Sequence, residues 1–122
     1  MDSKKIVLDV GQCNPDHAAI SRVLEQCGVA VLRAHTGEDA KRLISAGGVV
    51  LVLVNRTLDA DGSDGMALVQ ELLKIGKVPV MLVSNYPEYQ ARAVEMGALQ
   101  GFGKASLGEP ATLALLRRAL SQ

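Results

Sequence analysis

Residues 49–54 read Val-Val-Leu-Val-Leu-Val, an unbroken run of six apolar residues rich in β-branched side chains. A strand with one face in water alternates apolar and polar residues, whereas a strand covered on both faces is apolar throughout. The run is therefore typical of a central strand in a parallel sheet that lies between two layers of helices.

Other apolar segments flank this run on both sides, and helical segments separate them. The expected strands are Ile6–Val10, 29–32, 49–54, 78–83 and 99–103. The expected helices are 15–27, 37–47, Gly65–Ile75, Pro87–Met96 and Pro110–Leu120. Asn14 before Pro15, and Thr36, are suitable N-caps for the first two helices. We therefore predict one α/β domain over residues 1–122, with a five-stranded parallel sheet, helices on both faces and right-handed crossovers.

Composition narrows the class of partner. The chain has 13 basic and 13 acidic residues and no formal net charge, so we expect neither a nucleic-acid partner nor a membrane partner. Its longest apolar run is far shorter than the ~20 residues that a membrane span needs. Cys13 and Cys27 bracket the first helix roughly 20 Å apart, too far for a disulfide. These features together predict a reduced, cytoplasmic protein.

In open parallel sheets, functional groups lie beyond the carboxyl ends of the strands. The residues at those ends are Gly11, Gln12, Asn55, Ser84 and Lys104. Two histidines, with no clustered cysteines or carboxylates, do not predict a metal site, and no nucleophile–base pair or cofactor-binding glycine pattern stands out. We therefore expect no metal, no cofactor and no enzyme activity.

Three stretches of the sequence resemble the receiver domain of bacterial response regulators. The segment 79–84 is similar to the family's fourth strand, which ends in a switch serine or threonine, here Ser84. Asp64 and Gly65 are similar to the opening of its third helix, and Lys104 stands seven residues after Gly97, the family's spacing. The resemblance implies a flavodoxin-like (βα)5 topology with strand order 2-1-3-4-5.

The same resemblance places the family's phosphoacceptor aspartate at Asn55 and its acidic pair at Gly11 and Gln12. The switch aromatic position is Gly101. An amide is a poor nucleophile, and Mg²⁺ needs oxygen ligands that these positions do not provide. Phosphoryl transfer is thus not expected, although the switch serine and the lysine are retained.

The leading hypothesis is a phosphorylation-independent pseudo-receiver that works as a protein-interaction or scaffolding module in two-component-type signalling. In the receiver family, the fourth helix, fifth strand and fifth helix commonly form the contact surface for a partner or a second copy. The residues expected there are Tyr86, Tyr89, Gln90, Phe102 and Arg118. Two alternatives stay open: a small-ligand sensor that uses the vestigial pocket, and a phosphorelay receiver with Asp59 or Asp61 as a displaced acceptor.

Three polar residues have competing interpretations at this stage. Asp9 lies inside an apolar strand and needs a partner, such as Lys104 or backbone N–H groups, unless its position is exposed. Ser84 is expected either to serve as a switch or to bond local backbone. Asn55 is able to accept from Lys104 or to donate to a neighbouring carbonyl and hold its loop in one state.

Overall fold

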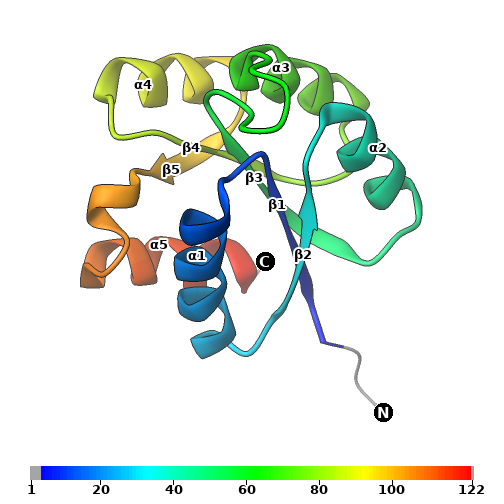
Figure 1. Cartoon of the computed structure of the whole chain (residues 1–122). Coiled ribbons are helices and arrows are strands. Elements are labelled where there is room, and N and C mark those ends of the chain that lie inside the picture. Colours follow the sequence, from blue (N-terminus) through cyan, green and yellow to red (C-terminus); the bar gives the residue numbers. More distant parts are fainter. Residues whose placement is uncertain (1–3, 122) are drawn as a thin grey trace.

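The valine and leucine run forms the middle of a five-stranded parallel sheet in the computed structural model, which describes residues 4–121 (Figure 1). The strands are β1 (Ile6–Val10), β2 (Ala30–Ala34), β3 (Val49–Asn55), β4 (Val80–Val83) and β5 (Leu99–Phe102). They lie in the order β2-β1-β3-β4-β5, which confirms the predicted topology. The helices are α1 (Asn14–Gln26), α2 (Gly37–Ser45), α3 (Gly65–Ile75), α4 (Pro87–Met96) and α5 (Pro110–Leu120), with a 3₁₀ turn, η1 (Lys104–Ser106).

Helices cover both faces of the sheet, with α2, α3 and α4 on one side and α1 and α5 on the other (Figure 1). The side chains of β3 alternate between the two cores. Val52 and Val54 pack beneath the first group of helices, while Leu51 and Leu53 pack against the second. All four side chains are fully buried. The prediction of a strand covered on both faces is confirmed.

Local signals set most of the element boundaries, with small differences from expectation. The Asp39 N–H donates to Thr36 Oγ1 at 3.2 Å, so Thr36 caps α2 as predicted. Helix α1 begins one residue earlier than predicted, with the extended Cys13 at the capping position and Asn14 already helical. Strand β4 begins at Val80, after Pro79, which has no N–H to give to the sheet.

Two further findings concern the cysteines and the length and hydropathy of the helices. Cys13 and Cys27 are both free thiols, as the spacing predicted. Within residues 4–121, no helix combines the length and the apolar character needed to cross a membrane.

Because the strands are parallel, the carboxyl ends of β1, β3, β4 and β5 meet at one edge of the sheet, where the candidate residues lie.

Candidate functional site

Asn55 ends the central strand and is tied to backbone on both sides of the site. Its side-chain amide nitrogen donates to the carbonyl oxygen of Gly11 at 3.1 Å and to that of Thr57 at 2.8 Å. Both amide protons are thereby used, one across to the end of β1 and one within its own loop. Of the two roles that the sequence allowed, donation to neighbouring carbonyls is the one observed. The amide fixes the loop after β3 to the end of β1.

Leu58 fills the space over Gly11. The leucine side chain is only 1% exposed, and a Cβ atom built on Gly11 would lie 2.3 Å from its Cδ2 atom. Gly11 also has a φ of +80°, which side-chain-bearing residues rarely adopt. The N–H of Asp59 donates to the Gly11 carbonyl at 2.9 Å, which holds the loop down. The positive φ and the cover of Leu58 therefore both disfavour any side chain at this position, a carboxylate included.

Gln12, the second of the two acidic-pair positions, is buried at 1% exposure. Its backbone carbonyl accepts a hydrogen bond from the Arg33 guanidinium at 2.9 Å. A side chain in that place does not face solvent at the strand ends. The two positions that the resemblance assigns to cation ligands thus hold a glycine under a leucine and a buried amide.

Asp9 is fully buried and pairs with a residue that the sequence analysis did not connect to it. Its Oδ2 atom lies 2.6 Å from Nδ1 of His17 on α1, and Ser21 Oγ lies 3.4 Å from the other ring nitrogen. The prediction of Lys104 or backbone groups as partners was wrong. Strand alternation turns Asp9 towards α1, with Arg33 as its cross-strand neighbour on β2. The pair anchors the first turn of α1 to the sheet.

Burial raises the pKa of the Asp9 carboxyl above its ordinary value, and the hydrogen bond and charge of His17 offset only part of that rise. A histidine eight residues away across a strand end and a loop leaves no periodic signal in the sequence. The only available signal was the demand of a buried aspartate for a partner.

Ser84 and Lys104 stand at the ends of β4 and β5, as expected. The N–H of Tyr86 donates to Ser84 Oγ at 3.2 Å, which is the local backbone role rather than a contact across the site. The Lys104 ammonium pairs with Asp16 at 2.7 Å, with both side chains about one-third exposed. This pairing, chiefly its hydrogen bond, lowers the pKa of the Asp16 carboxyl.

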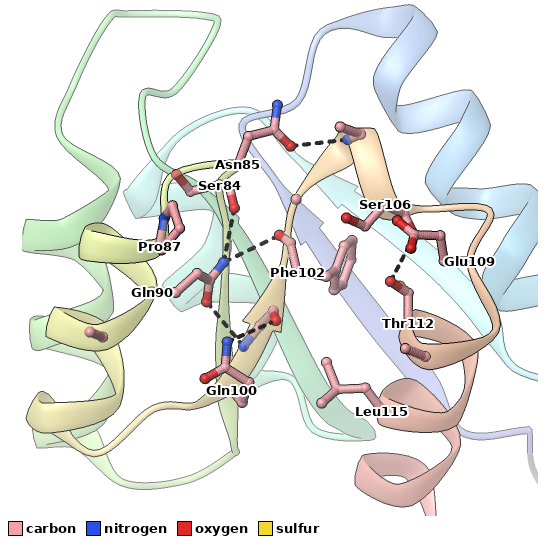
Figure 2. A pocket seen from close by; sticks show the side chains of 15 residues that line it. Ser84, Asn85, Pro87, Gln90, Gln100, Phe102, Ser106, Glu109, Thr112 and Leu115 are labelled. Carbon is pink, nitrogen blue, oxygen red and sulfur yellow. Dashed lines mark hydrogen bonds between the residues drawn. The ribbon is translucent and has the colours of Figure 1, made fainter.

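Gln90 and Phe102, two of the five residues expected to contact a partner, are only 7% and 5% exposed. Their side chains line a hollow instead of projecting from the surface, so neither is an exposed side chain. Phe102 packs in the core beneath α1 and α5, and Gln90 bonds to backbone (Figure 2). Each residue faces into a helix–sheet interface, Phe102 on the side of the sheet covered by α1 and α5, and Gln90 on the side covered by α4.

The Gln90 side chain joins the backbones of β4 and β5. Its amide nitrogen shares two protons among the carbonyl oxygens of Leu82 at 2.8 Å, Ser84 at 3.2 Å and Phe102 at 3.3 Å. Figure 2 shows the bonds to Ser84 and Phe102. Its amide oxygen accepts from the Gly101 N–H at 3.1 Å. The pairing of β4 with β5 shifts register at this point. Gln90 therefore supplies bonds that the irregular strand pair does not make for itself.

Gly101 occupies the position where the resemblance places a switch aromatic, and no larger residue fits there. A Cβ atom would lie 2.0 Å from the Leu82 carbonyl oxygen and 2.9 Å from Gln90 Oε1. Sequence reasoning noted the missing aromatic but not its consequence. The edge between α4 and β5 has no side chain that can rotate and is held by the Gln90 amide.

The other expected contact residues remain accessible to different degrees. Tyr86 is 58% exposed, Arg118 is exposed, and Tyr89 is half-buried. The two tyrosine rings meet edge to face at 5.9 Å. The guanidinium of Arg56, the residue after Asn55, lies 4.4 Å from the centre of the Tyr89 ring. This stacking connects the loop after β3 to α4.

In the loop after β3, the carboxylates of Asp61 and Asp64 accept hydrogen bonds from residues close by in the sequence. Asp61 accepts from the N–H and the hydroxyl of Ser63, which lowers the pKa of its carboxyl. Asp64 caps α3 by accepting from the Met66 N–H at 3.0 Å. Within residues 4–121, no three histidine, cysteine or acidic side chains are grouped so as to hold a metal ion.

The similarities to known proteins are all to solved structures. No protein-family model and no curated protein matches the sequence. Among solved structures, the BeF₃-activated N-terminal receiver domain of RstA from Klebsiella pneumoniae is 26% identical with a TM-score of 0.81, and the match covers 97% of this chain and 100% of that one. The N-terminal domain of a response regulator/sensory box/GGDEF protein from Carboxydothermus hydrogenoformans is 24% identical with a TM-score of 0.78, covering 96% and 94%.

NtrX from Brucella abortus is also similar, at 24% identity and a TM-score of 0.77. That match covers 95% of this chain but 27% of NtrX, so the chain spans about a quarter of that protein's length. All three similar structures are response regulators or their receiver domains. They support a receiver domain of the two-component type for this chain.

Proposed function

Given a receiver fold whose strand-end residues depart from phosphoryl chemistry, we propose that this chain is a phosphorylation-independent pseudo-receiver. In this proposal it binds a protein partner, or a second copy of itself, through the surface formed by α4, β5 and α5. Its role is that of an interaction or scaffolding module in bacterial two-component-type signalling. It does no chemistry of its own.

The observation that carries the proposal is the pair of bonds made by Asn55 together with the cover of Leu58. A phosphoacceptor must present a free carboxylate oxygen beside a bound cation. At this position an amide donates both protons to the carbonyls of Gly11 and Thr57, and a buried leucine occupies the adjoining space. The loop is thereby held in a single arrangement that needs no phosphoryl group.

Gln90 supports the same conclusion at the contact surface. Four hydrogen bonds from one side chain hold α4 to the backbones of β4 and β5, and Gly101 offers no side chain to move. A surface that is fixed in this way presents one shape at all times. Binding through it would be constitutive and would be regulated by the partner's availability.

The surface itself has features that suit a partner. A hollow of about 540 Å³ lies between α4, β5 and α5, with Phe102 and Gln90 in its floor and Leu115 and Glu109 on the α5 side (Figure 2). Tyr86, the residue before α4, is 58% exposed, and Arg118 is exposed on α5. Tyrosine and arginine are enriched among the residues that dominate binding energy at interfaces.

The absence of phosphorylation is tested by incubation with acetyl phosphate and MgCl₂, followed by intact mass spectrometry. We expect no phosphoryl adduct. A stable adduct that disappears in Asp59→Asn or Asp61→Asn would instead establish the displaced-acceptor alternative. An adduct on neither residue but elsewhere would also contradict the proposal.

Partner binding is tested with surface variants that spare the core. We expect Tyr86→Ala and Arg118→Ala each to weaken self-association, or binding of a captured and then purified partner, by about thirtyfold, equivalent to ~2 kcal/mol. Arg22→Ala, on the exposed side of α1, is the matched control and should leave affinity unchanged. Circular dichroism checks that each variant is folded.

The opposite pattern of results would refute the proposal. If Asn55→Ala abolished binding while Tyr86→Ala and Arg118→Ala left it intact, the strand ends and not the α4–β5–α5 surface would carry the contact. Tyr89 is a poorer probe, because its ring packs against the core and its loss would also affect stability.

A further inference from the structure

We propose that this protein binds a small polyanion, a molecule with two or more charged oxyanion groups, in a hollow at the amino ends of β1 and β2. This amino-end hollow measures about 410 Å³ and lies at the edge of the sheet opposite to the strand ends where Asn55 lies. At ~30 Å³ for each water molecule, that volume corresponds to roughly fourteen waters, which is enough for a triphosphate or a tricarboxylate. The lining includes Lys4, Lys5, Cys27, Arg117, Leu120 and Ser121.

The lining of the amino-end hollow is basic. Lys4 and Lys5 precede β1, Arg117 lies in the last turn of α5, and all three residues are exposed. Among the described residues that line the hollow, none is acidic. None of the three cations forms an ion pair with an acidic side chain of residues 4–121. Cations that converge on one hollow repel one another, and a polyanion between them relieves that repulsion.

Two helix ends meet the hollow and reduce its positive potential without cancelling it. Helix α1 ends at Gln26, next to Cys27, and α5 ends at Leu120. Each helix C-terminus carries roughly half a negative elementary charge. The Lys5 ammonium donates to the Leu120 carbonyl, so one cation already serves the end of α5. The two ends together offset about one of the three positive charges, and about two remain for a ligand.

The backbone around the hollow is fixed by the core and the sheet. Cys27 packs with Leu120 in the core beneath α1 and α5. The Ala30 N–H donates to the Lys5 carbonyl at 2.8 Å, which joins the segment before β1 to the start of β2. Arg117 supplies a guanidinium, whose N–H edge matches two oxygens of a phosphate or carboxylate group at once. Binding therefore has to order only the ends of a few long side chains.

The inference goes beyond the proposed function and does not depend on it. The amino-end hollow shares no lining residue with the hollow between α4, β5 and α5. Failure of one site would leave the other untouched, so the two proposals are tested separately.

Cys27 reports the charge in the hollow, because its free thiol belongs to the lining. Iodoacetate and iodoacetamide alkylate thiols by the same displacement of iodide and have nearly the same size, but only iodoacetate is an anion. Peptide mass spectrometry at pH 7 and low salt measures the rate with each reagent. We expect the ratio of the iodoacetate rate to the iodoacetamide rate to be about tenfold higher at Cys27 than at Cys13, a free thiol outside the hollow. That factor is the attraction of two unit charges at ~6 Å through water.

Loss of one cation should remove part of this preference. We expect Lys4→Gln and Arg117→Gln each to lower the ratio at Cys27 about threefold, and the double variant to bring it within about twofold of the ratio at Cys13. Lys77→Gln, an exposed lysine outside the hollow, is the matched control and should leave the ratio unchanged. Circular dichroism checks that each variant is folded.

Binding itself is measured as protection of Cys27 from iodoacetamide, with NaCl used to keep the ionic strength constant. Sodium triphosphate and sodium citrate should each protect the thiol saturably with a Kd of about 1 mM, the affinity expected of two charge-assisted hydrogen bonds. The lower of the two Kd values assigns the ligand to phosphates or to carboxylates. Sodium acetate, with a single charge, should give no protection up to 20 mM.

Three outcomes would overturn the proposal. Equal ratios at Cys27 and Cys13 would show that Lys4, Lys5 and Arg117 only offset the helix ends. The absence of protection by either polyanion up to 20 mM, or equal protection by acetate, would show that the hollow does not select polyanions. Protection that persists in the double variant would place the bound anion elsewhere. Tyr86→Ala should retain both the ratio and the protection, which separates this site from the partner surface.

Discussion

Replacing His17 with alanine removes the side chain that pairs at 2.6 Å with the fully buried carboxylate of Asp9. Breaking a buried pair by deleting one member costs 3–5 kcal/mol, because the remaining charge stays in a poorly solvated place. His17 retains 21% side-chain exposure, so water partly replaces it and the lower end of that range applies. We expect His17→Ala to lower the free energy of unfolding by about 3 kcal/mol at pH 7 and the melting temperature by roughly 10 °C.

The stability cost of His17→Ala should also depend on pH, because it acts through the ionisation of Asp9. Burial raises the pKa of Asp9 above its ordinary value, so the unfolded chain releases this proton at lower pH than the folded chain does. As pH rises above about 4, ionisation of Asp9 therefore lowers the free energy of unfolding by up to ~1.4 kcal/mol per pH unit. This loss ends once the pH passes the pKa that Asp9 has in the folded protein. Without His17 that folded pKa is higher still, so the deficit of His17→Ala should grow between pH 4 and pH 7.

Urea unfolding followed by circular dichroism at several pH values measures both predictions. The exposed His35 provides a matched control, since His35→Ala should change stability by less than about 0.5 kcal/mol. In an Asp9→Asn background, where no carboxylate is left unpaired, most of the cost of His17→Ala should disappear. A deficit below 1 kcal/mol at pH 7, or one that does not vary with pH, would refute the argument that His17 compensates a buried charge.

Three further outcomes are expected. Gln90→Ala should destabilise the fold by ~2–3 kcal/mol and speed hydrogen exchange of the Gly101 amide, since that buried N–H loses its acceptor; unchanged exchange would contradict this. Asn55→Asp should remain unlabelled by acetyl phosphate in mass spectrometry and lose ~1–2 kcal/mol in urea unfolding, because a carboxylate would face two carbonyl oxygens. MgCl₂ at 10 mM should not raise the melting temperature, whereas a site with a Kd of ~0.1 mM would add ~2.7 kcal/mol.

The arrangement of the elements was accessible from sequence because the signals are local. The apolar run of β3 specifies burial on both faces of the sheet. The hydroxyl of Thr36 caps the first turn of α2 and so marks where that helix begins. Each such signal involves residues within a few positions of one another. The strand order came from the resemblance to receiver domains, and the structure confirms it.

The candidate site was predicted in position but not in its bonding. Asn55, Gly11, Ser84 and Lys104 lie at the strand ends, where the sequence placed them, because parallel strands bring their carboxyl ends to one edge. The partners of these residues were mostly not foreseen. Lys104 pairs with Asp16, and the expected contact residue Gln90 turned out to be an internal bridge.

The sequence by itself determined that this chain is an α/β domain with a receiver-like order of elements, in which Gly11, Gln12 and Asn55 stand where the resemblance expects acidic residues. Only the tertiary structure decided that Leu58 covers Gly11, that His17 meets Asp9, and that Gln90 joins β4 to β5. The physical reason is the distance along the chain over which each kind of interaction acts. Hydrophobic periodicity and caps act between neighbours along the chain, whereas a buried polar atom or a filled cavity finds its partner only after distant segments have packed together.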